Sequence, residues 1–323
     1  MGKTKRISLI LASAFMLTSI AACTPSTTTS TTAGTTAAGT TVAGTVANSE
    51  ITGNIETDGS STVYPLSEAV IEEAKKAMPK LNVTASPSGS SAGIKRLISG
   101  EIDIAASSRA IKAEEIATAK AAGIEIVELQ VGIDGIAVVA SKNNPVDNMS
   151  FEDLTKIFAK DSTIKTWKEA NAAFPDATLA LFSPGTSSGT YEYFTEHVLK
   201  TKNEQRASDV QVSEDDNVLV TGVSGSEGGL GYFGYTYAEE NADKLKIMKV
   251  NGIEATQATI LDGTYPLARP IFLYVNKKAV SEKPEVKAFL NFYLDNAITL
   301  ATEIMMVPAS PAAIDASKAA LTK

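Results

Sequence analysis

Gly89-Ser90-Ser91-Ala92-Gly93 separates a strand expected at residues 81–85 from a helix expected to bury Ile94, Leu97 and Ile98. The first four N–H groups of a helix have no partner within the helix, and the helix dipole adds partial positive charge beside them. A helix start that follows small hydroxyl residues is therefore a ready site for an anion. A single run is weak evidence, because Ser and Thr are also ordinary helix caps.

Two further runs of this kind precede helix-like patterns, Gly59-Ser60-Ser61-Thr62 and Thr186-Ser187-Ser188-Gly189-Thr190, and Ser107-Ser108-Arg109 adds a fourth polar run. Pro65 fits the first turn of the helix that follows the first of them. Together the runs predict one oxyanion that is held from several sides.

Alternation of strands and helices is expected from Ile51 onward, which indicates an α/β fold with mostly parallel sheets. Open sheets of this class bind ligands at the carboxyl ends of their strands, where the hydroxyl runs are expected. Two separate strands are expected at residues 124–129 and 135–141.

The chain beyond residue 48 is long enough for two domains, and no Pro- or Gly-rich linker separates them. We therefore expect two lobes with the ligand in the cleft between them. The chain is expected to cross between the lobes near residues 130–134 and again near 262–267. The expected first lobe comprises residues 49–131 and 266–323, and the expected second lobe comprises residues 132–265.

The N-terminal residues are typical of an export signal, with Lys3, Lys5 and Arg6 before an apolar stretch at 7–20. Ile20-Ala21-Ala22-Cys23 resembles a bacterial lipobox, in which the cysteine is acylated. We expect a lipoprotein signal peptide at 1–22, lipidation (palmitate) at Cys23 and a flexible Thr/Ala/Gly-rich tether at 23–48. The alternative is an ordinary signal peptide with a cysteine nearby. The protein is then expected at the extracytoplasmic face of the cell membrane, held by a lipid anchor.

The net charge argues against a nucleic-acid partner. The formal charge is −8, and removal of residues 1–22 takes away three basic residues and no acidic ones, which leaves −11. No basic stripe is visible, so no nucleic acid is expected. An anion site in this chain must act through local dipoles and one or two cations at contact range.

One run matches an enzyme motif. Gly185-Thr186-Ser187-Ser188-Gly189 fits the G-x-S-x-G pattern of a serine-hydrolase nucleophile. A hydrolase also needs a base, and the only histidine, His197, falls on the helix after the same run, whereas hydrolases place it well downstream. A secreted serine hydrolase or phosphatase is therefore the weaker alternative, and His197 is expected on a helix surface.

Gly229-Leu230-Gly231-Tyr232-Phe233-Gly234 matches G-x-G-x-x-G, but it lies late in the chain and enters an aromatic run. Dinucleotide binding requires this pattern near the start of a βαβ unit. A structural strand or core patch is favoured instead. Because no Cys or His spacing typical of metal ligands occurs, and no P-loop or EF-hand pattern, neither a cofactor nor a metal is expected.

Two charged residues occupy apolar surroundings. Arg109 follows Ser107-Ser108 at the end of an expected strand, where its guanidinium could fork onto two oxyanion oxygens or form a surface salt bridge. Asp134 stands at the expected first crossing, where a buried carboxylate needs a partner. It could pair with Arg109, accept a hydrogen bond from a protonated ligand oxygen or brace the hinge.

The chain resembles the phosphate-binding components of the Pst ABC phosphate importers from about Ile51 to its C-terminus. The resemblance is carried by six fragments in order, namely residues 58–65, 89–93, 104–109, 184–191, 213–217 and 265–270. It implies the two-lobed type II periplasmic-binding-protein fold with mixed or parallel sheets and a double-crossover hinge. It also implies a non-catalytic, monomeric receptor for inorganic phosphate whose partners are the permease subunits of the importer.

The resemblance implies a site at Ser61, Thr62, Val63, Ser90, Ser108, Ser188, Gly189 and Thr190. Two positions depart from the family: Ser108 replaces an Asp that accepts the phosphate proton, and Pro184 replaces an Arg. We expect Arg109 to supply the missing cation and Asp134 the missing proton acceptor, which adds both residues to the site. Sulfate, molybdate or another oxyanion is the alternative ligand, and a sensor or adhesion lipoprotein is a further alternative.

Overall fold

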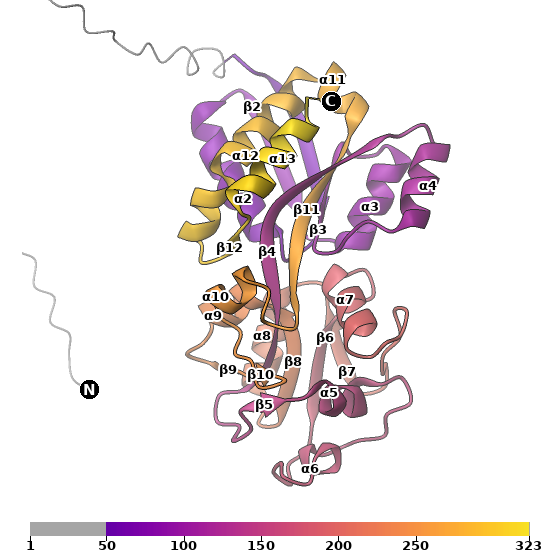
Figure 1. The fold of residues 1–323 in the computed structure, drawn as a ribbon, viewed down its shortest axis with the longest axis vertical. Coiled ribbons are helices and arrows are strands. Elements are labelled where there is room, and N and C mark those ends of the chain that lie inside the picture. The colour runs from indigo at the N-terminus through magenta and orange to yellow at the C-terminus, as the bar shows by residue number, and fades with distance from the viewer. Residues whose placement is uncertain (1–49, 323) are drawn as a thin grey trace, which may run out of the picture. The chain divides into compact units, whose positions relative to one another are not determined.

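The structure is a computed structural model that describes residues 50–322, in which strands and helices alternate as expected (Figure 1). The signal peptide expected at 1–22, Cys23 and the tether expected at 23–48 lie outside the described residues. Among the helices of residues 50–322, none combines the length and the apolar character that a membrane crossing requires.

The described residues form twelve strands: β1 Gly53–Gly59, β2 Leu81–Ser86, β3 Ile104–Ser107, β4 Ile126–Ser141, β5 Asn148–Met149, β6 Ala180–Pro184, β7 Val210–Ser213, β8 Gly229–Gly234, β9 Leu245–Ile247, β10 Lys249–Val250, β11 Ala268–Asn276 and β12 Val307–Pro308. Ten of them make one sheet in the order β2-β1-β3-β11-β4-β8-β6-β7, with β9 and β12 paired to β4. β5 and β10 pair separately.

The sheet is mixed rather than mostly parallel. Strands β2, β1 and β3 are parallel to one another, and so are β8, β6 and β7. Between these two groups, β11 and β4 run antiparallel to each other and to their outer neighbours. The expectation of mostly parallel pairing therefore holds for the outer strands of each lobe and fails for β4 and β11, whose pairings with β3, β8, β9 and each other are antiparallel.

β4 is a single strand that passes from one lobe to the other (Figure 1). It pairs with β11 as far as Gly135, opposite Ala268, and with β8 from Ile136 onward. The expectation of separate strands at 124–129 and 135–141 was wrong, because residues 130–134 stay in the ladder with β11 instead of forming a turn.

The first lobe surrounds β1, β2 and β3 with six helices: α2 Tyr64–Ala77, α3 Ser90–Ser99, α4 Ala113–Ala121, α11 Lys277–Glu282, α12 Pro284–Glu303 and α13 Pro311–Ala320. Its main core packs apolar side chains of α2, such as Leu66 and Val70, with Phe289 and Leu290 of α12. A smaller cluster with Ile94 and Leu97 holds α3 on the sheet. The C-terminal helices thus complete a core that the N-terminal strands begin.

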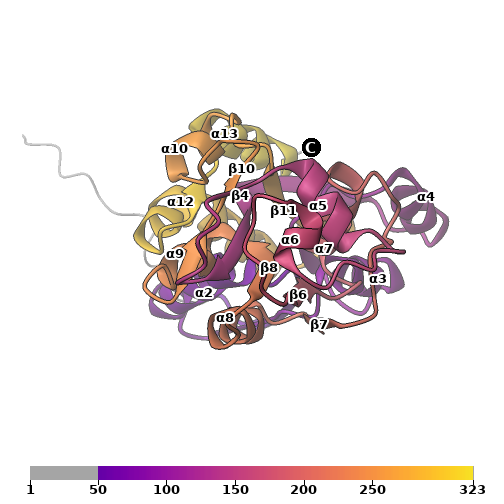
Figure 2. The same ribbon diagram turned by 90° about the horizontal axis from the view of Figure 1, so that it is seen from below.

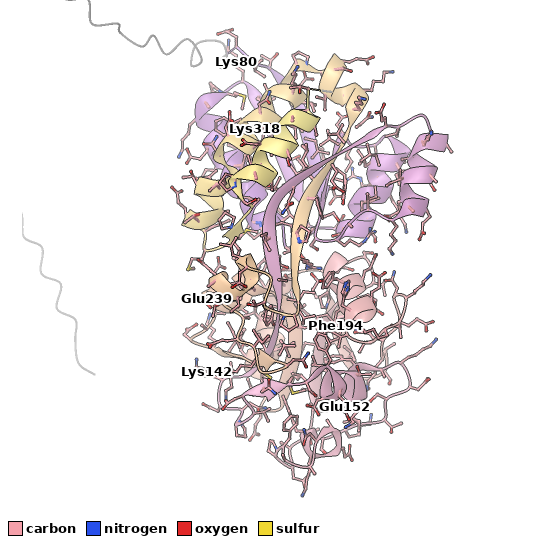
Figure 3. All side chains as sticks on the ribbon, in the orientation of Figure 1. Lys80, Lys142, Glu152, Phe194, Glu239 and Lys318 are labelled. Atoms are coloured by element: carbon pink, nitrogen blue, oxygen red, sulfur yellow. The ribbon has the colours of Figure 1, made fainter. Side chains whose placement is uncertain are left out.

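The second lobe contains α5 Phe151–Phe158, α6 Trp167–Ala170, α7 Gly189–His197, α8 Asp216–Gly225, α9 Tyr235–Glu240 and α10 Gln257–Leu261. Seen from below, α5, α6 and α7 lie on one side of β6 and β8, and α8 lies on the other (Figure 2). Phe194 of α7, labelled in Figure 3, stacks on Tyr232 with ring centroids 3.8 Å apart. Gly229–Gly234 forms buried β8, in agreement with the structural reading of that glycine pattern.

Close backbone contacts fix the loops that follow β1 and β2. Gly59 has φ +137°, and a Cβ at this position would lie 2.1 Å from the carbonyl oxygen of Ala106. A Cβ on Gly93 would lie 2.5 Å from the carbonyl oxygen of Asp58. Only glycine allows this approach, which brings the segment before α2 against the end of β3 and the start of α3 against the end of β1.

Candidate functional site

The hydroxyl runs of both lobes meet at one place. Oγ1 of Thr62 lies 3.3 Å from Oγ1 of Thr190, and the Ser91 N–H donates to the Ser187 carbonyl oxygen at 2.9 Å. Thr62 and Ser91 belong to the first lobe, and Ser187 and Thr190 belong to the second. The expected convergence of runs that are distant in the sequence is therefore present in the structure.

The end of β3 joins the same cluster. The Ser108 N–H donates to Oγ of Ser90 at 3.1 Å, and the two hydroxyls lie 3.3 Å apart. A Cβ on Gly189 would lie 2.6 Å from Oγ of Ser90, so the second lobe reaches this pair directly. All eight hydroxyl-run residues expected in the site are buried or nearly so: Ser61, Thr62, Val63, Ser90, Ser108, Ser188, Gly189 and Thr190.

Three helices begin at this cluster, as the sequence predicts. α2 begins after Val63, α3 after Gly89 and α7 after Ser188. Only Ser188 caps its own helix, by accepting from the Thr190 and Tyr191 N–H groups. The N-cap residues of α2 and α3 supply no side-chain acceptor, so these helix starts retain donors and positive dipole ends for an anion.

Arg109 lies at the lobe boundary, and four of its five N–H groups donate to protein acceptors. Glu115 takes a bidentate pair at 2.7 and 2.8 Å, the Ala110 carbonyl and Oγ of Ser91 take one donor each, and Nε lies 2.6 Å from Glu192. Burial lowers the pKa of Arg109, but the two glutamates outweigh burial and raise it above its usual value. In this structure the fork of Arg109 contacts Glu115, and its expected contact with a ligand stays a prediction.

Glu192 is the centre of an ion-pair network between the lobes. This α7 carboxylate is 2% exposed and lies 2.6 Å from Nε of Arg109 and 2.7 Å from Nζ of Lys112, and Oγ of Ser91 also donates to it. All three of these partners are in the first lobe. Glu192 therefore links the starts of α3 and α7, the two helices whose hydroxyl runs meet here.

Arg269 is the cation that contacts the hydroxyl runs. It is 2% exposed, and it donates to Oγ1 of Thr190 at 2.6 Å and to the Gly189 carbonyl oxygen at 2.8 Å. Its guanidinium also lies over the Tyr193 ring, 5.4 Å from the centroid. Arg269 lies in the fragment 265–270 that carries the family resemblance, but no role in the site was predicted for it. The available signal was an arginine at the start of the apolar run 271–275.

Asp134 holds Arg269 in this position. The two residues face each other in the β4–β11 ladder, and Oδ2 of Asp134 accepts from Nε at 3.3 Å and from Nη2 at 3.0 Å. Burial raises the pKa of Asp134, although Arg269 opposes that shift. Asp134 is therefore paired with an arginine, as one of the expectations had it, but the arginine is Arg269 and not Arg109.

Asp216 is a second buried acid that sequence reasoning missed. It is the first residue of α8, 1% exposed, and Oγ of Ser61 donates to its Oδ1 at 3.5 Å. Burial, and then the nearby charge of Asp134, raise the pKa of Asp216 to about 7. The run Glu214-Asp215-Asp216 was visible in the sequence, but nothing there indicated which carboxylate would be buried.

The structure does not assemble a hydrolase triad around Ser187. His197 is exposed on α7, as predicted, and its ring stacks on Tyr193 with centroids 3.7 Å apart. The Ser187 N–H donates to Oε1 of Glu214 at 3.1 Å. Within residues 50–322 the contacts of the only histidine are therefore directed at Tyr193 and not at Ser187.

Comparisons with known proteins agree with this geometry. A family model of the PBP superfamily domain matches residues 25–297. Protein SphX of Synechococcus elongatus is 46% identical over 262 residues, which cover 79% of this chain and 77% of SphX. Phosphate-binding protein PstS of Staphylococcus haemolyticus is 36% identical over 253 residues, which cover 76% of this chain and 78% of PstS. A Clostridium perfringens structure with bound phosphate, described as a phosphate ABC transporter substrate-binding protein, matches with a TM-score of 0.68 at 28% identity, covering 80% of this chain and 100% of that one.

Neutralising Glu192 should weaken the contact between the lobes. Glu192→Gln keeps the size of the side chain but removes the charge that pairs with Arg109 and Lys112. We expect a larger radius of gyration by small-angle X-ray scattering and a loss of about 1.5–3 kcal/mol in unfolding free energy, the range for a hydrogen bond to a charged group. Glu196→Gln, on the exposed face of the same helix, is the control. Equal radii of gyration for the wild type, Glu192→Gln and Glu196→Gln would contradict the expectation.

Asp216 should make stability depend on pH in a defined direction. Its folded pKa of about 7 exceeds the ordinary 3.8, so the folded state binds the proton more tightly than the unfolded state. Stability is therefore lost as pH rises from about 4 to about 7 and is constant above that range. Relative to the wild type, Asp216→Asn should gain unfolding free energy across this window, with an upper limit of about 4 kcal/mol. Urea unfolding at several pH values measures the difference, and a constant difference would mean that Asp216 titrates normally.

Proposed function

The chain belongs to the PBP superfamily and, within it, to the family of SphX and PstS, and we propose from this that it is an extracytoplasmic receptor that binds inorganic phosphate and delivers it to an ABC importer. The fold is the two-lobed type II fold of periplasmic phosphate-binding proteins. One observation carries the proposal: three helix starts rich in hydroxyl groups, from two lobes, meet at one buried cluster.

The chemistry of the cluster suits a tetrahedral oxyanion. Helix N–H groups and Ser or Thr hydroxyls donate hydrogen bonds, and the helix dipoles favour negative charge. We propose that phosphate is held by the hydroxyl-run residues named above, with the Val63 N–H among the donors. Such contacts act at short range, so an acidic chain can still bind an anion.

We propose Arg269, in place of Arg109, as the cation of the site. Arg269 already donates to Oγ1 of Thr190, and four of its five N–H groups are accounted for by Asp134, Gly189 and Thr190. Asp134 then acts by positioning Arg269. Arg109 contributes through Glu192, by holding the starts of α3 and α7 together.

The bound ion would be enclosed by a hinge motion of the lobes. We propose that the lobes move about β4 and the start of β11, with residues 49–131 and 266–323 in one lobe and 132–265 in the other. The hydrogen bonds and ion pairs between the lobes support a closed form that the permease would recognise. No bond of the ligand is broken in this role, so we propose a non-catalytic protein, acting as a monomer.

We propose that the receptor is tethered to the extracytoplasmic membrane face through an acylated Cys23. The lipobox-like sequence before Cys23 and the Thr-rich stretch after it support this arrangement. Mass spectrometry of the N-terminal peptide distinguishes an acylated cysteine from an ordinary signal cleavage.

Calorimetric titration tests the proposed ligand. The purified protein, freed of bound anion, should bind one phosphate per chain and should not respond to sulfate at near-neutral pH. Phosphate carries at least one proton there and sulfate carries none, so a site with a buried acceptor rejects sulfate. Sulfate binding equal to or tighter than phosphate binding would overturn the ligand assignment in favour of another oxyanion.

The same titration distinguishes the two arginines. Lysine keeps the charge but cannot make the forked contacts of Arg269, so Arg269→Lys should weaken phosphate binding by about 10- to 100-fold. Arg109→Lys should have a smaller effect, because its contacts are with protein groups only. A large loss in Arg109→Lys with none in Arg269→Lys would return the role of ligand cation to Arg109.

A further inference from the structure

We propose that Asp216 is the carboxylate that accepts the hydrogen bond of a protonated oxyanion, and that it thereby selects phosphate over sulfate. This inference rests on the proposed function. It concerns a residue that neither the hydroxyl runs nor the family resemblance assigned to the site. Without Asp216, the site described above consists mainly of donors, and donors alone accept sulfate as readily as phosphate.

Asp216 is positioned at the edge of the hydroxyl cluster. Its Oδ1 faces Oγ of Ser61 from the opposite lobe, at 3.5 Å. A methyl group built on Gly234 would lie 3.5 Å from both Oδ2 of Asp216 and Cγ2 of Thr62, so the carboxylate and Thr62 border the same space. Tyr237 closes this side by donating to the Ser61 carbonyl oxygen at 3.0 Å.

Oδ2 of Asp216 has no hydrogen-bond partner among the residues of the described range. A buried carboxylate oxygen without a donor costs free energy, and a bound ligand that brings a proton removes this cost. Burial, and then the nearby charge of Asp134, raise the pKa of Asp216, although the backbone of Gly234 and the charge of Arg269 oppose this shift. The arrangement therefore lacks one donor, which a protonated ligand oxygen supplies.

The other acids near the cluster are already engaged. Asp134 accepts two hydrogen bonds from Arg269, and Glu192 is paired with Arg109 and Lys112. Glu214 also has a buried oxygen without a partner, but the side chain is only partly buried and its other oxygen accepts from the Ser187 N–H. Oε2 of Glu192 also lacks a hydrogen bond, but Arg109 and Lys112 lie within ion-pair distance of it. Asp216 is the acid near the cluster that combines full burial with an oxygen that has neither a hydrogen bond nor a paired cation.

Selection follows from the charge of Asp216. An ionised carboxylate gains a hydrogen bond from phosphate, whereas unprotonated sulfate would meet it with like charge and no donor. An asparagine of the same shape offers an amide that can donate to either ion. Removal of the charge should therefore reduce phosphate binding and admit sulfate.

The test is a pair of titrations, phosphate and sulfate, on the full chain and on Asp216→Asn. We expect the ratio of sulfate to phosphate dissociation constants to fall by about 10- to 100-fold, the range for one hydrogen bond to a charged group. Asp215→Asn is the matched control. It removes the adjacent but exposed charge and keeps a residue that caps α8 well.

Asp216→Asn should fold, because it removes a buried charge. If Asp216→Asn does not fold, Asp216→Ala provides a second variant. An unchanged selectivity ratio in a folded Asp216 variant, with a selective wild type, would refute the role of Asp216 and leave the receptor function intact. A wild type that binds neither ion would instead refute the receptor function. Equal changes in Asp215→Asn and Asp216→Asn would reduce the effect to general electrostatics and also overturn the proposal.

Discussion

The antiparallel ladder between β4 and β11 is the constraint on which the rest of the structure depends. It joins the two lobes, and its register sets Asp134 opposite Arg269 at the point where β4 leaves one lobe for the other. Because both residues are buried, neither charge is tolerable without the other. The ion pair in turn fixes the guanidinium against Thr190 and Gly189. The same hydrogen-bonded ladder thus joins the two lobes and supports the candidate site.

The residues between the lobes divide into a neutral cluster of hydrogen-bond donors and two groups of charged side chains around it. The hydroxyl runs and helix starts are neutral, and they surround the candidate ligand position with donors. The formal charges lie around them, with Arg109, Lys112, Glu115 and Glu192 on one side and Arg269, Asp134 and Asp216 on the other. The first group is balanced within itself and can hold the lobes together without a ligand. The second group has two buried acids and one cation, and this excess of negative charge underlies the role proposed for Asp216.

The candidate site was predictable in part from the sequence. Runs such as Ser90-Ser91 and Ser188-Gly189 lie next to their helices in the chain, so local patterning located three helix starts correctly. The same local view assigned Arg109 to the ligand, because a terminal Ser-Ser-Arg looks like part of an anion loop. In the structure its fork is bound by Glu115, and Nε pairs with Glu192, which is 83 positions further along the chain. No periodicity or motif links positions that far apart.

The sequence by itself determined the α/β pattern, the three hydroxyl-bearing helix starts and the surface position of His197. Each of these depends on neighbours within a few residues, where capping, periodicity and helix geometry act. Only the tertiary structure decided which carboxylate faces which cation. Arg269 and Asp134 are separated by 135 positions, and Asp216 and Ser61 by 155. Burial and charge pairing are properties of the packed interior, because the dielectric environment and the partners of a side chain exist only once distant segments have come together.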